Sequence, residues 1–254
     1  MTMTRKGSSH YIKTHGPQDA AITKGFQWLL SEAKKSNNLG IVAVSTKANL
    51  ENISNWSGLR TVLDQLRQTG QAKVGDVTLN LVTLKGTIYS SDAPILAIYG
   101  GQELLDKVDG ISGTSSVLYI PWGDESLANW VDTWRATELG QPQTSAAEQV
   151  EPTSGVVYFA LESLTSSVNL SSGIGHPNDY ERAVRTLETL FHKQPAVEPE
   201  LIRQQLVRLG WNPKDAGKVK ELAEKIWEGR RPKKSVGRAD ETLWNYWNSK
   251  SKLT

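Results

Sequence analysis

Three short turns in the first half of the chain carry residue types that bind anions and planar ligands. Hydroxyls and glycine N–H groups at a helix start donate to phosphates, a lysine supplies a counter-charge, and an indole lines pockets for planar ligands. The turns therefore predict a nucleotide- or phosphometabolite-binding crevice, as an enzyme or a sensor would have. The residues concerned are Ser45, Thr46, Lys47, Gly100, Gly101 and Trp122.

The alternative is that the small residues in these turns only close tight connections between strands and helices. A glycine pair such as Gly100-Gly101 lacks the specificity of a full phosphate-binding motif, and neither GxGxxG nor GxxxxGK[ST] is present. This purely structural interpretation is favoured for the glycines and the hydroxyls. Trp122 is harder to assign to a core, because it stands in the turn itself.

The C-terminal tail, residues 229–254, is the second candidate. Its segment GRRPKKSVGR has five positive charges and no acid, and aromatic residues follow it. Such a segment releases counterions from phosphates without reading sequence, and aromatic rings stack on unpaired bases. The residues expected to contact nucleic acid or a partner protein are Arg230, Arg231, Lys233, Lys234, Arg238, Trp244 and Trp247.

The two tail tryptophans also have an interpretation that involves no ligand. Trp244 and Trp247 are three residues apart and would share one face of a short helix. They would then dock the tail onto the body of the same chain or onto a second subunit, so an oligomer is one of the arrangements left open.

The residues needed for several kinds of chemistry are missing. There is no cysteine, which excludes a disulfide scaffold, a thiolate nucleophile and an iron–sulfur cluster. The four histidines have neither HxH nor HExxH spacing, and no GxSxG elbow is present. The acidic pairs Asp106/Asp109 and Asp124/Glu125 are interpreted as solvated helix ends. We therefore expect no metal, haem or iron–sulfur cofactor, and nothing in the sequence identifies an enzyme.

Charge and hydropathy suggest where a partner would bind. The net charge is +2, but residues 16–228 hold 19 basic and 25 acidic residues, so the basic excess belongs to the two ends. The polar N-terminus lacks the apolar stretch of a signal peptide, and the longest apolar runs are too short to cross a bilayer. These features predict a cytoplasmic protein with no membrane contact.

Hydrophobic periodicity predicts an α/β domain over residues 17–140. Short apolar runs are typical of strands buried on both faces, and they alternate with segments of helical spacing. Strand, turn and helix in this order predict a small, mostly parallel, Rossmann-like sheet. The expected strands are 41–45, 77–84, 95–99 and 117–120, and Lys85-Gly86 leaves open a hairpin or one long strand with a bulge.

The remaining segments have different characters. Residues 1–16 are interpreted as a disordered leader and 141–155 as a linker or a long loop. A helical domain is expected over 156–228, with Asn178 or Asp179 capping one of its helices. The tail at 229–254 is expected to be basic and to contain one short helix.

Parts of the chain resemble an uncharacterised bacterial protein family. The resemblance is carried by Leu161–Leu190 (LESLTSSVNLSSGIGHPNDYERAVRTLETL), the following Gly210-Trp211, and Val117–Trp134 (VLYIPWGDESLANWVDTW). It implies a Rossmann-like front half, a helical back half and a bacterial or phage source, and it carries no activity.

The sequence therefore leaves the function unknown and favours a non-catalytic binding or interaction protein that contacts nucleic acid through its basic tail. The alternative is a nucleotide- or phosphometabolite-binding enzyme or sensor that uses the strand-end turns.

Overall fold

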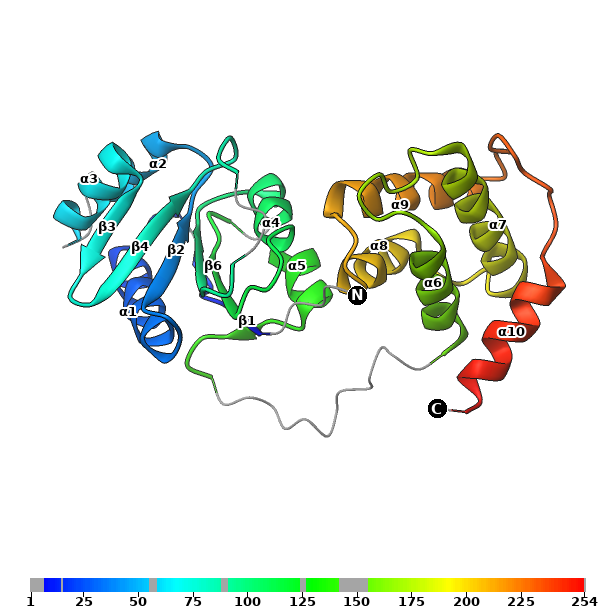
Figure 1. Cartoon of the computed structure of the whole chain (residues 1–254), viewed down its shortest axis with the longest axis horizontal. Coiled ribbons are helices and arrows are strands. Elements are labelled where there is room, and N and C mark those ends of the chain that lie inside the picture. The colour runs from blue at the N-terminus through cyan, green and yellow to red at the C-terminus, as the bar shows by residue number, and fades with distance from the viewer. Residues whose placement is uncertain are drawn as a thin grey trace. The chain divides into compact units, whose positions relative to one another are not determined.

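The structure is a computed structural model that describes residues 7–14, 16–54, 59–87, 91–123, 127–141 and 155–253. The chain divides into two compact units, Met3–Gln143 and Thr144–Thr254. The first contains a mostly parallel sheet with flanking helices, and the described part of the second is built from helices (Figure 1). The expected α/β fold followed by a helical region is confirmed.

The described part of the first unit forms a sheet of seven strands in the order β3-β4-β2-β5-β6-β1-β7. All neighbouring strands are parallel except β3 and β4, which are antiparallel. The carboxyl ends of the parallel strands therefore meet at one edge. The strands are β1 (Ser8–Tyr11), β2 (Leu39–Ala43), β3 (Gln71–Val74), β4 (Val77–Val82), β5 (Ile95–Ile98), β6 (Ser116–Ile120) and β7 (Thr137–Glu138).

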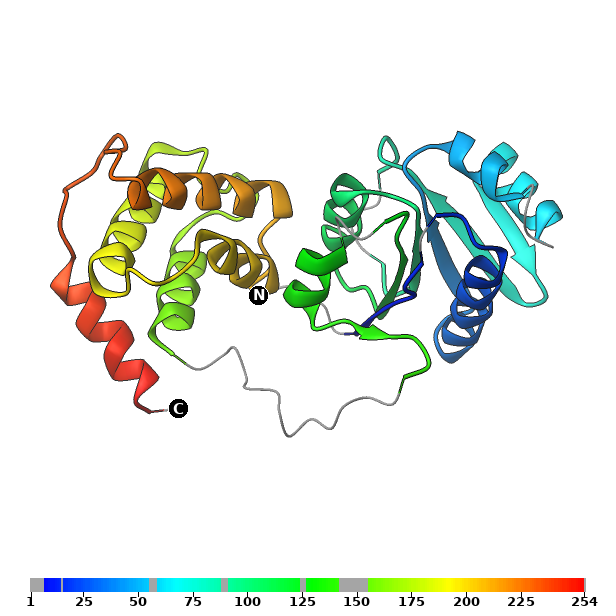
Figure 2. The ribbon, with the colours of Figure 1, turned by 180° about the vertical axis from the view of Figure 1, so that it is seen from behind.

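Helices cover both faces of this sheet (Figures 1 and 2). The first face packs against α1 (Asp19–Lys35), α2 (Lys47–Ser54) and α3 (Arg60–Thr69), and the second against α4 (Gln102–Asp109) and α5 (Leu127–Trp134). Alternate residues of one strand serve the two layers, because successive side chains point to opposite faces. Val42 and Val44 of the β2 segment thus join the first layer, and Ile41 and Ala43 join the second.

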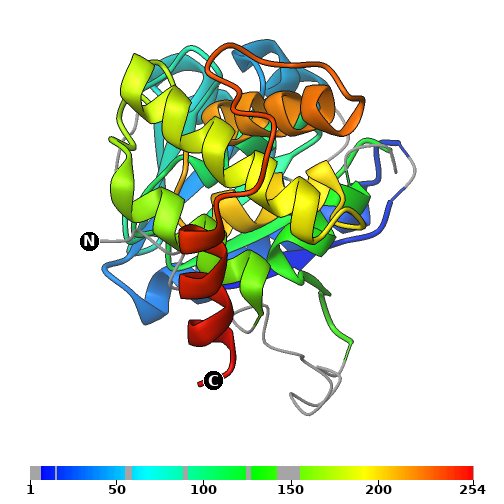
Figure 3. The same ribbon diagram turned by 90° about the vertical axis from the view of Figure 1, so that its right-hand side faces the viewer.

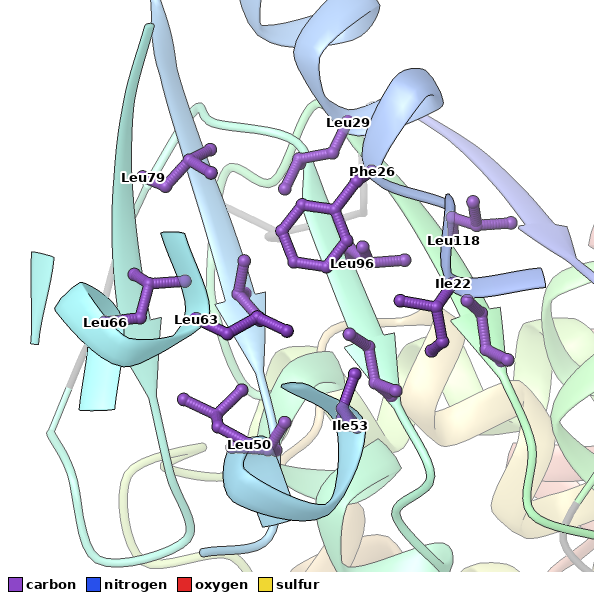
Figure 4. Close-up of a cluster of buried hydrophobic side chains, with 14 of the residues drawn as sticks. Ile22, Phe26, Leu29, Leu50, Ile53, Leu63, Leu66, Leu79, Leu96 and Leu118 are labelled. Atoms are coloured by element: carbon purple, nitrogen blue, oxygen red, sulfur yellow. The ribbon is translucent and has the colours of Figure 1, made fainter. Parts of the chain in front are cut away.

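In the first hydrophobic layer, the apolar residues that recur at helical spacing in α1, α2 and α3 form the buried faces of these helices. In Figure 4 apolar side chains from α1, α2 and α3 meet those from strands of the sheet in one cluster. The ten labelled side chains are each at most 2% exposed. The labelled residues are Ile22, Phe26, Leu29, Leu50, Ile53, Leu63, Leu66, Leu79, Leu96 and Leu118.

The strand β1 corrects the prediction of a disordered leader over residues 1–16. It lies between β6 and β7 and is parallel to both, with Ser8 opposite Ser116 and Tyr11 opposite Glu138. Its sequence SSHY has no apolar pattern, and its partner Ser116 is 108 residues away in the chain. Main-chain hydrogen bonds to β6 and β7 therefore hold β1 in the sheet, although its side chains show no hydrophobic pattern that would predict a strand.

The polar side chains of this segment are satisfied within the unit. The two ring nitrogens of His10 form hydrogen bonds with Ser8 Oγ at 2.9 Å and Thr137 Oγ1 at 3.0 Å. Burial is the main cause that lowers the pKa of His10 below its ordinary value, so the ring is neutral at pH 7. Beyond the strand, Thr14 Oγ1 donates to the Pro121 carbonyl at 2.8 Å. Residues 1–6 and His15 lie outside the described residues.

The sheet contains a hairpin formed by β3 and β4, which lies before β4 and not after it at Lys85-Gly86. β4 pairs antiparallel with β3, which precedes it, and Gly75 in the connecting turn has φ +58°. A left-handed residue of this kind suits the turn, and glycine adopts it at no steric cost. β4 ends at Val82, so neither of the two arrangements proposed for Lys85-Gly86 describes the pairing of this strand. Residues 88–90 lie outside the described part.

The described part of the second unit contains α6 (Val156–Ser167), α7 (Pro177–Lys193), α8 (Pro199–Arg208), α9 (Pro213–Trp227) and α10 (Glu241–Ser251). α7 begins two or three residues earlier than predicted: His176 is its N-cap, accepting from the Asn178 N–H, and Pro177 opens the helix. Neither Asn178 nor Asp179 is therefore the cap. Proline suits a first helical position because the N–H it lacks would have no intrahelical partner there.

Candidate functional site

The three predicted turns lie at the carboxyl edge of the sheet. They follow β2, β5 and β6, which are parallel neighbours, so the structure brings these turns to one edge. The chain leaves the adjacent β2 and β5 in opposite directions, with α2 on one face and α4 on the other. Such a switch point is where open α/β sheets bind ligands.

The first turn is occupied by its own hydrogen bonds. The Thr46 N–H and its hydroxyl both donate to Asn49 Oδ1, at 2.9 and 2.7 Å. The Ser45 carbonyl accepts from the Leu84 N–H at 3.3 Å, and Lys47 is the first residue of α2 and is exposed. In this structure the donors of Thr46 close the start of a helix, which agrees with the structural interpretation of the turn.

The two glycines of the second turn differ in their surroundings: Gly100 is closely packed and Gly101 faces open space. A Cβ on Gly100 would lie 2.2 Å from Leu104 Cδ2, and the Tyr119 hydroxyl donates to the Gly100 carbonyl. Gly101 is exposed, caps α4 without a side-chain bond, and has open space where a Cβ would stand. Glu103 already complements the dipole in the first turn of α4, and its charge would oppose a phosphate there.

The third turn presents an aromatic surface. Trp122 is 54% exposed and stands edge-to-face with Tyr99, with ring centroids 5.3 Å apart. Tyr99 directly follows β5 in a left-handed conformation with φ +51°, and its hydroxyl accepts from the Gln18 N–H at 2.9 Å. Burial raises the pKa of Tyr99 above its ordinary value, so the phenol is neutral at pH 7. Asp124 and Glu125 of the same turn lie outside the described residues.

The basic tail is fixed to the helical unit. We call residues 229–240 the strap, because this segment crosses α7 between α9 and α10 (Figure 3). Glu188 of α7 is 4% exposed, and its carboxylate accepts from the Ser235 hydroxyl, the Val236 N–H at 3.0 Å and the Gly237 N–H at 3.3 Å. A carboxylate with several such donors holds a backbone segment in place through charge-assisted hydrogen bonds.

The end of the strap is held by further contacts. The Asp240 N–H donates to Thr189 Oγ1 at 3.0 Å, and the Asp240 carboxylate pairs with Arg185 Nε at 2.8 Å. Asp240 Oδ1 also accepts from the Thr242 and Leu243 N–H groups and caps α10. The strap thus passes from a fixed point on α7 directly into a capped helix.

The five cations of the strap are not equivalent. Arg230 pairs with Glu228, and Lys234 Nζ lies 3.2 Å from Glu181 Oε2. The other three are Arg231, Lys233 and Arg238, which are exposed and have no acidic partner among the described residues.

The two tail tryptophans have different surroundings. Trp247 is 0% exposed and is the one buried residue of α10, which packs against α6 and α7. It is therefore enclosed within its own unit, as the docking interpretation describes, and not available to stack on a base. Trp244 is half-buried with Lys193 Nζ 5.9 Å from its ring centroid. The exposed ring of α10 is instead that of Tyr246, at 52%.

Sequence reasoning missed the residues of α7 that fix the strap. Glu188 lies four residues after the inward-facing Val184 and one after Leu187, so it stands on the apolar face of the helix. A charged residue on such a face needs a partner, and this was the available signal. The identity of that partner depends on a fold-back of the tail that no local pattern encodes.

The part of the chain that resembles a known protein family lies in the helical unit. Residues 153–248 match the model of a family described as Domain of unknown function (DUF1889). No curated protein and no solved structure matches the chain. The resemblance of Leu161–Leu190 and Gly210-Trp211 to an uncharacterised family is thus confirmed, whereas Val117–Trp134 lies outside the match.

The matched residues include the strap, Glu188, which fixes it, and most of α10. In the described ranges no helix is long and apolar enough to cross a membrane. Within these ranges no three acidic, histidine or cysteine side chains lie close enough together to hold a metal ion.

Proposed function

We propose that the protein is a non-catalytic binding protein that contacts nucleic acid through the strap. The observation that carries the proposal is a set of three exposed cations, Arg231, Lys233 and Arg238, on a backbone fixed by Glu188. None of the three has an acidic partner within the part of the chain that the structure describes. Phosphates are bound by such cations because each contact releases condensed counterions.

Two further features support the same surface. Residues 155–254 contain 16 basic and 12 acidic residues, a net charge of +4, so the field around the strap favours a polyanion. The strap backbone is held by Glu188 and Thr189, so less conformational entropy is lost when its side chains bind. The strap carries no arrangement for reading base edges, so the expected binding is independent of sequence.

Neutralising the three free cations is the direct test. We expect the Arg231→Gln/Lys233→Gln/Arg238→Gln variant to bind nucleic acid more weakly and to lower the slope of log affinity against log salt by about 1 for each lost phosphate contact. The measurement is fluorescence anisotropy with labelled oligonucleotides over a series of salt concentrations.

The matched control removes three exposed cations elsewhere. Lys34, Lys73 and Lys214 are exposed and lie outside the strap, so their replacement by Gln changes the net charge equally. If the control variant loses as much affinity and slope as the strap variant, binding depends on net charge and not on the strap. An unmodified protein that binds no oligonucleotide at low salt would refute the proposal.

A second candidate function is favoured by the exposed aromatic surface at the sheet edge. Trp122 beside Tyr99 offers a planar apolar face at the edge where α/β sheets bind ligands. A nucleotide-like ligand there would be bound through its base, since the donors of Thr46 are already used.

This candidate predicts thermal stabilisation of the protein by a nucleoside mono- or triphosphate. A ligand at 100 times its Kd stabilises by about 2.7 kcal/mol, which a melting experiment resolves. The stabilisation should disappear in Trp122→Ala and persist in Tyr246→Ala, which removes an equally exposed ring from the other unit. The absence of a shift with every nucleotide tested would eliminate this candidate.

A cytoplasmic location and a bacterial or phage source belong to the same proposal. They remain predictions from the sequence.

A further inference from the structure

The strap forms one wall of an open cavity on the helical unit. The cavity has a volume of about 180 Å³ and lies between α7, the end of α9 and the strap. We call it the strap pocket. Its walls include Glu188, Phe191, His192, Ile226, Arg230 and Arg231.

The apolar wall of the strap pocket packs against other side chains of the helical unit. Phe191 is half-buried, and its ring centroid lies 5.2 Å from that of Trp227 and 5.4 Å from that of His192. Trp227 is itself fixed, because its indole N–H donates to the Pro195 carbonyl at 3.2 Å. Ile226 beside it is 5% exposed. The pocket therefore has an aromatic surface on a fixed support.

The charged wall of the pocket favours an anion. Arg230 and Arg231 are exposed and line the same cavity, and Arg230 also pairs with Glu228. The one acid among the lining residues is Glu188, and its oxygens accept from the Ser235 hydroxyl and from two N–H groups of the strap. An aromatic ring and guanidinium groups that line one cavity suit a ligand with a flat ring and a phosphate.

The volume of the strap pocket suits a single aromatic ring. An apolar cavity of about 150 Å³ is enough for a benzene molecule. The strap pocket, at about 180 Å³, is therefore large enough for one ring-sized group.

We propose that the strap pocket receives one unpaired nucleotide of a nucleic-acid strand, with the base against Phe191 and the phosphate at Arg231. The inference rests on the proposed function and specifies its substrate as single-stranded. A paired base stays within its duplex, and removing it costs unstacking and unpairing energy. The protein therefore binds single strands more tightly than duplexes.

The test compares a short oligothymidylate with a duplex of equal length on the full chain, by anisotropy at low salt. Removing the ring in Phe191→Leu is expected to weaken single-strand binding by about 5- to 150-fold, the range of one base–aromatic stack, and to leave duplex binding unchanged. Phe191→Tyr keeps the ring and is expected to bind the single strand as the parent does. Melting curves of both variants show whether the helical unit remains folded.

A competition experiment on the unmodified protein avoids any effect of substitution on folding. Excess thymidine monophosphate is expected to displace the oligothymidylate from the pocket and to leave bound duplex in place. Equal affinity for single strand and duplex, together with no competition, would overturn the pocket while leaving the nucleic-acid function intact. If the unmodified protein binds neither oligonucleotide, the proposed function itself fails, so the two failures are distinguishable.

Discussion

A chain that begins at Gly16 is expected to lose the folded α/β unit. The deletion removes β1, and with it the main-chain pairing to both β6 and β7. It also removes Ile12 and Thr14, which are 9% and 2% exposed. Losing an interior strand leaves two rows of buried backbone groups without partners, and each such group costs about 1–3 kcal/mol. The total is comparable to the about 5–15 kcal/mol that stabilises a whole domain.

The measurement is circular dichroism combined with limited proteolysis. The α/β unit should become protease-sensitive and lose its cooperative melting, while a fragment containing the helical unit persists. The control is a chain that begins at Gly7, which keeps all four residues of β1. If the chain that begins at Gly16 melts like this control, β1 is dispensable and the interpretation of the segment as a leader would be restored.

Replacing Trp247 by Ala is expected to detach α10 from the helical unit. Trp247 is the one buried residue of this helix, which packs against α6 and α7. The contacts that remain in the variant, a Lys193–Glu241 ion pair at 2.7 Å and Lys193 near the ring of Trp244, involve partly exposed side chains and contribute less. Truncating a large buried aromatic residue to Ala typically costs about 3–5 kcal/mol, which is a large part of the stability of one unit. The free energy of unfolding, from urea titration followed at the far-ultraviolet helix signal, measures this loss.

Two further variants separate packing from polarity at this position. Tyr246→Ala removes a ring that is 52% exposed on the same helix and is expected to change stability by no more than about 0.5 kcal/mol. Trp247→Phe keeps most of the apolar contact and removes an indole N–H that is buried without a partner in the described structure. It is therefore expected to cost less than the alanine variant. Equal stability of Trp247→Ala and the parent would show that α10 is held by other contacts.

The parts of the fold that could be predicted from the sequence are those in which local pattern and tertiary role coincide. β2, β5 and β6 are short runs of aliphatic residues buried on both faces, and their positions follow directly from the hydropathy. β1 and β3 could not be found in this way. The sequence SSHY of β1 is polar, and its pairing with strands distant in the chain is a tertiary property. The sequence QAKV of β3 is short and half polar, and the available signal for it was the two-residue turn Gly75-Asp76 before β4.

The residues of the candidate sites could also be predicted from the sequence only where a local pattern identifies them. Composition alone identified the cations of the strap, because charge density is visible without a fold. Which of them remain free depends on the positions of Glu228 and Glu181, and the fixation of the strap depends on Glu188. The structural role of Gly100 became visible only with the contact to Leu104.

The position of β1 has a consequence for how the chain acquires its fold during synthesis. β1 is made first, but its neighbour β6 begins 108 residues later, and β7 later still. At a synthesis rate of about 5–20 residues per second, the strand waits roughly 5–20 s before a partner exists. Throughout that interval its main-chain groups are unpaired, and pairing so distant in the chain closes slowly. The mostly polar composition of SSHY suits a strand that must remain in water without associating with other chains until the sheet around it has formed.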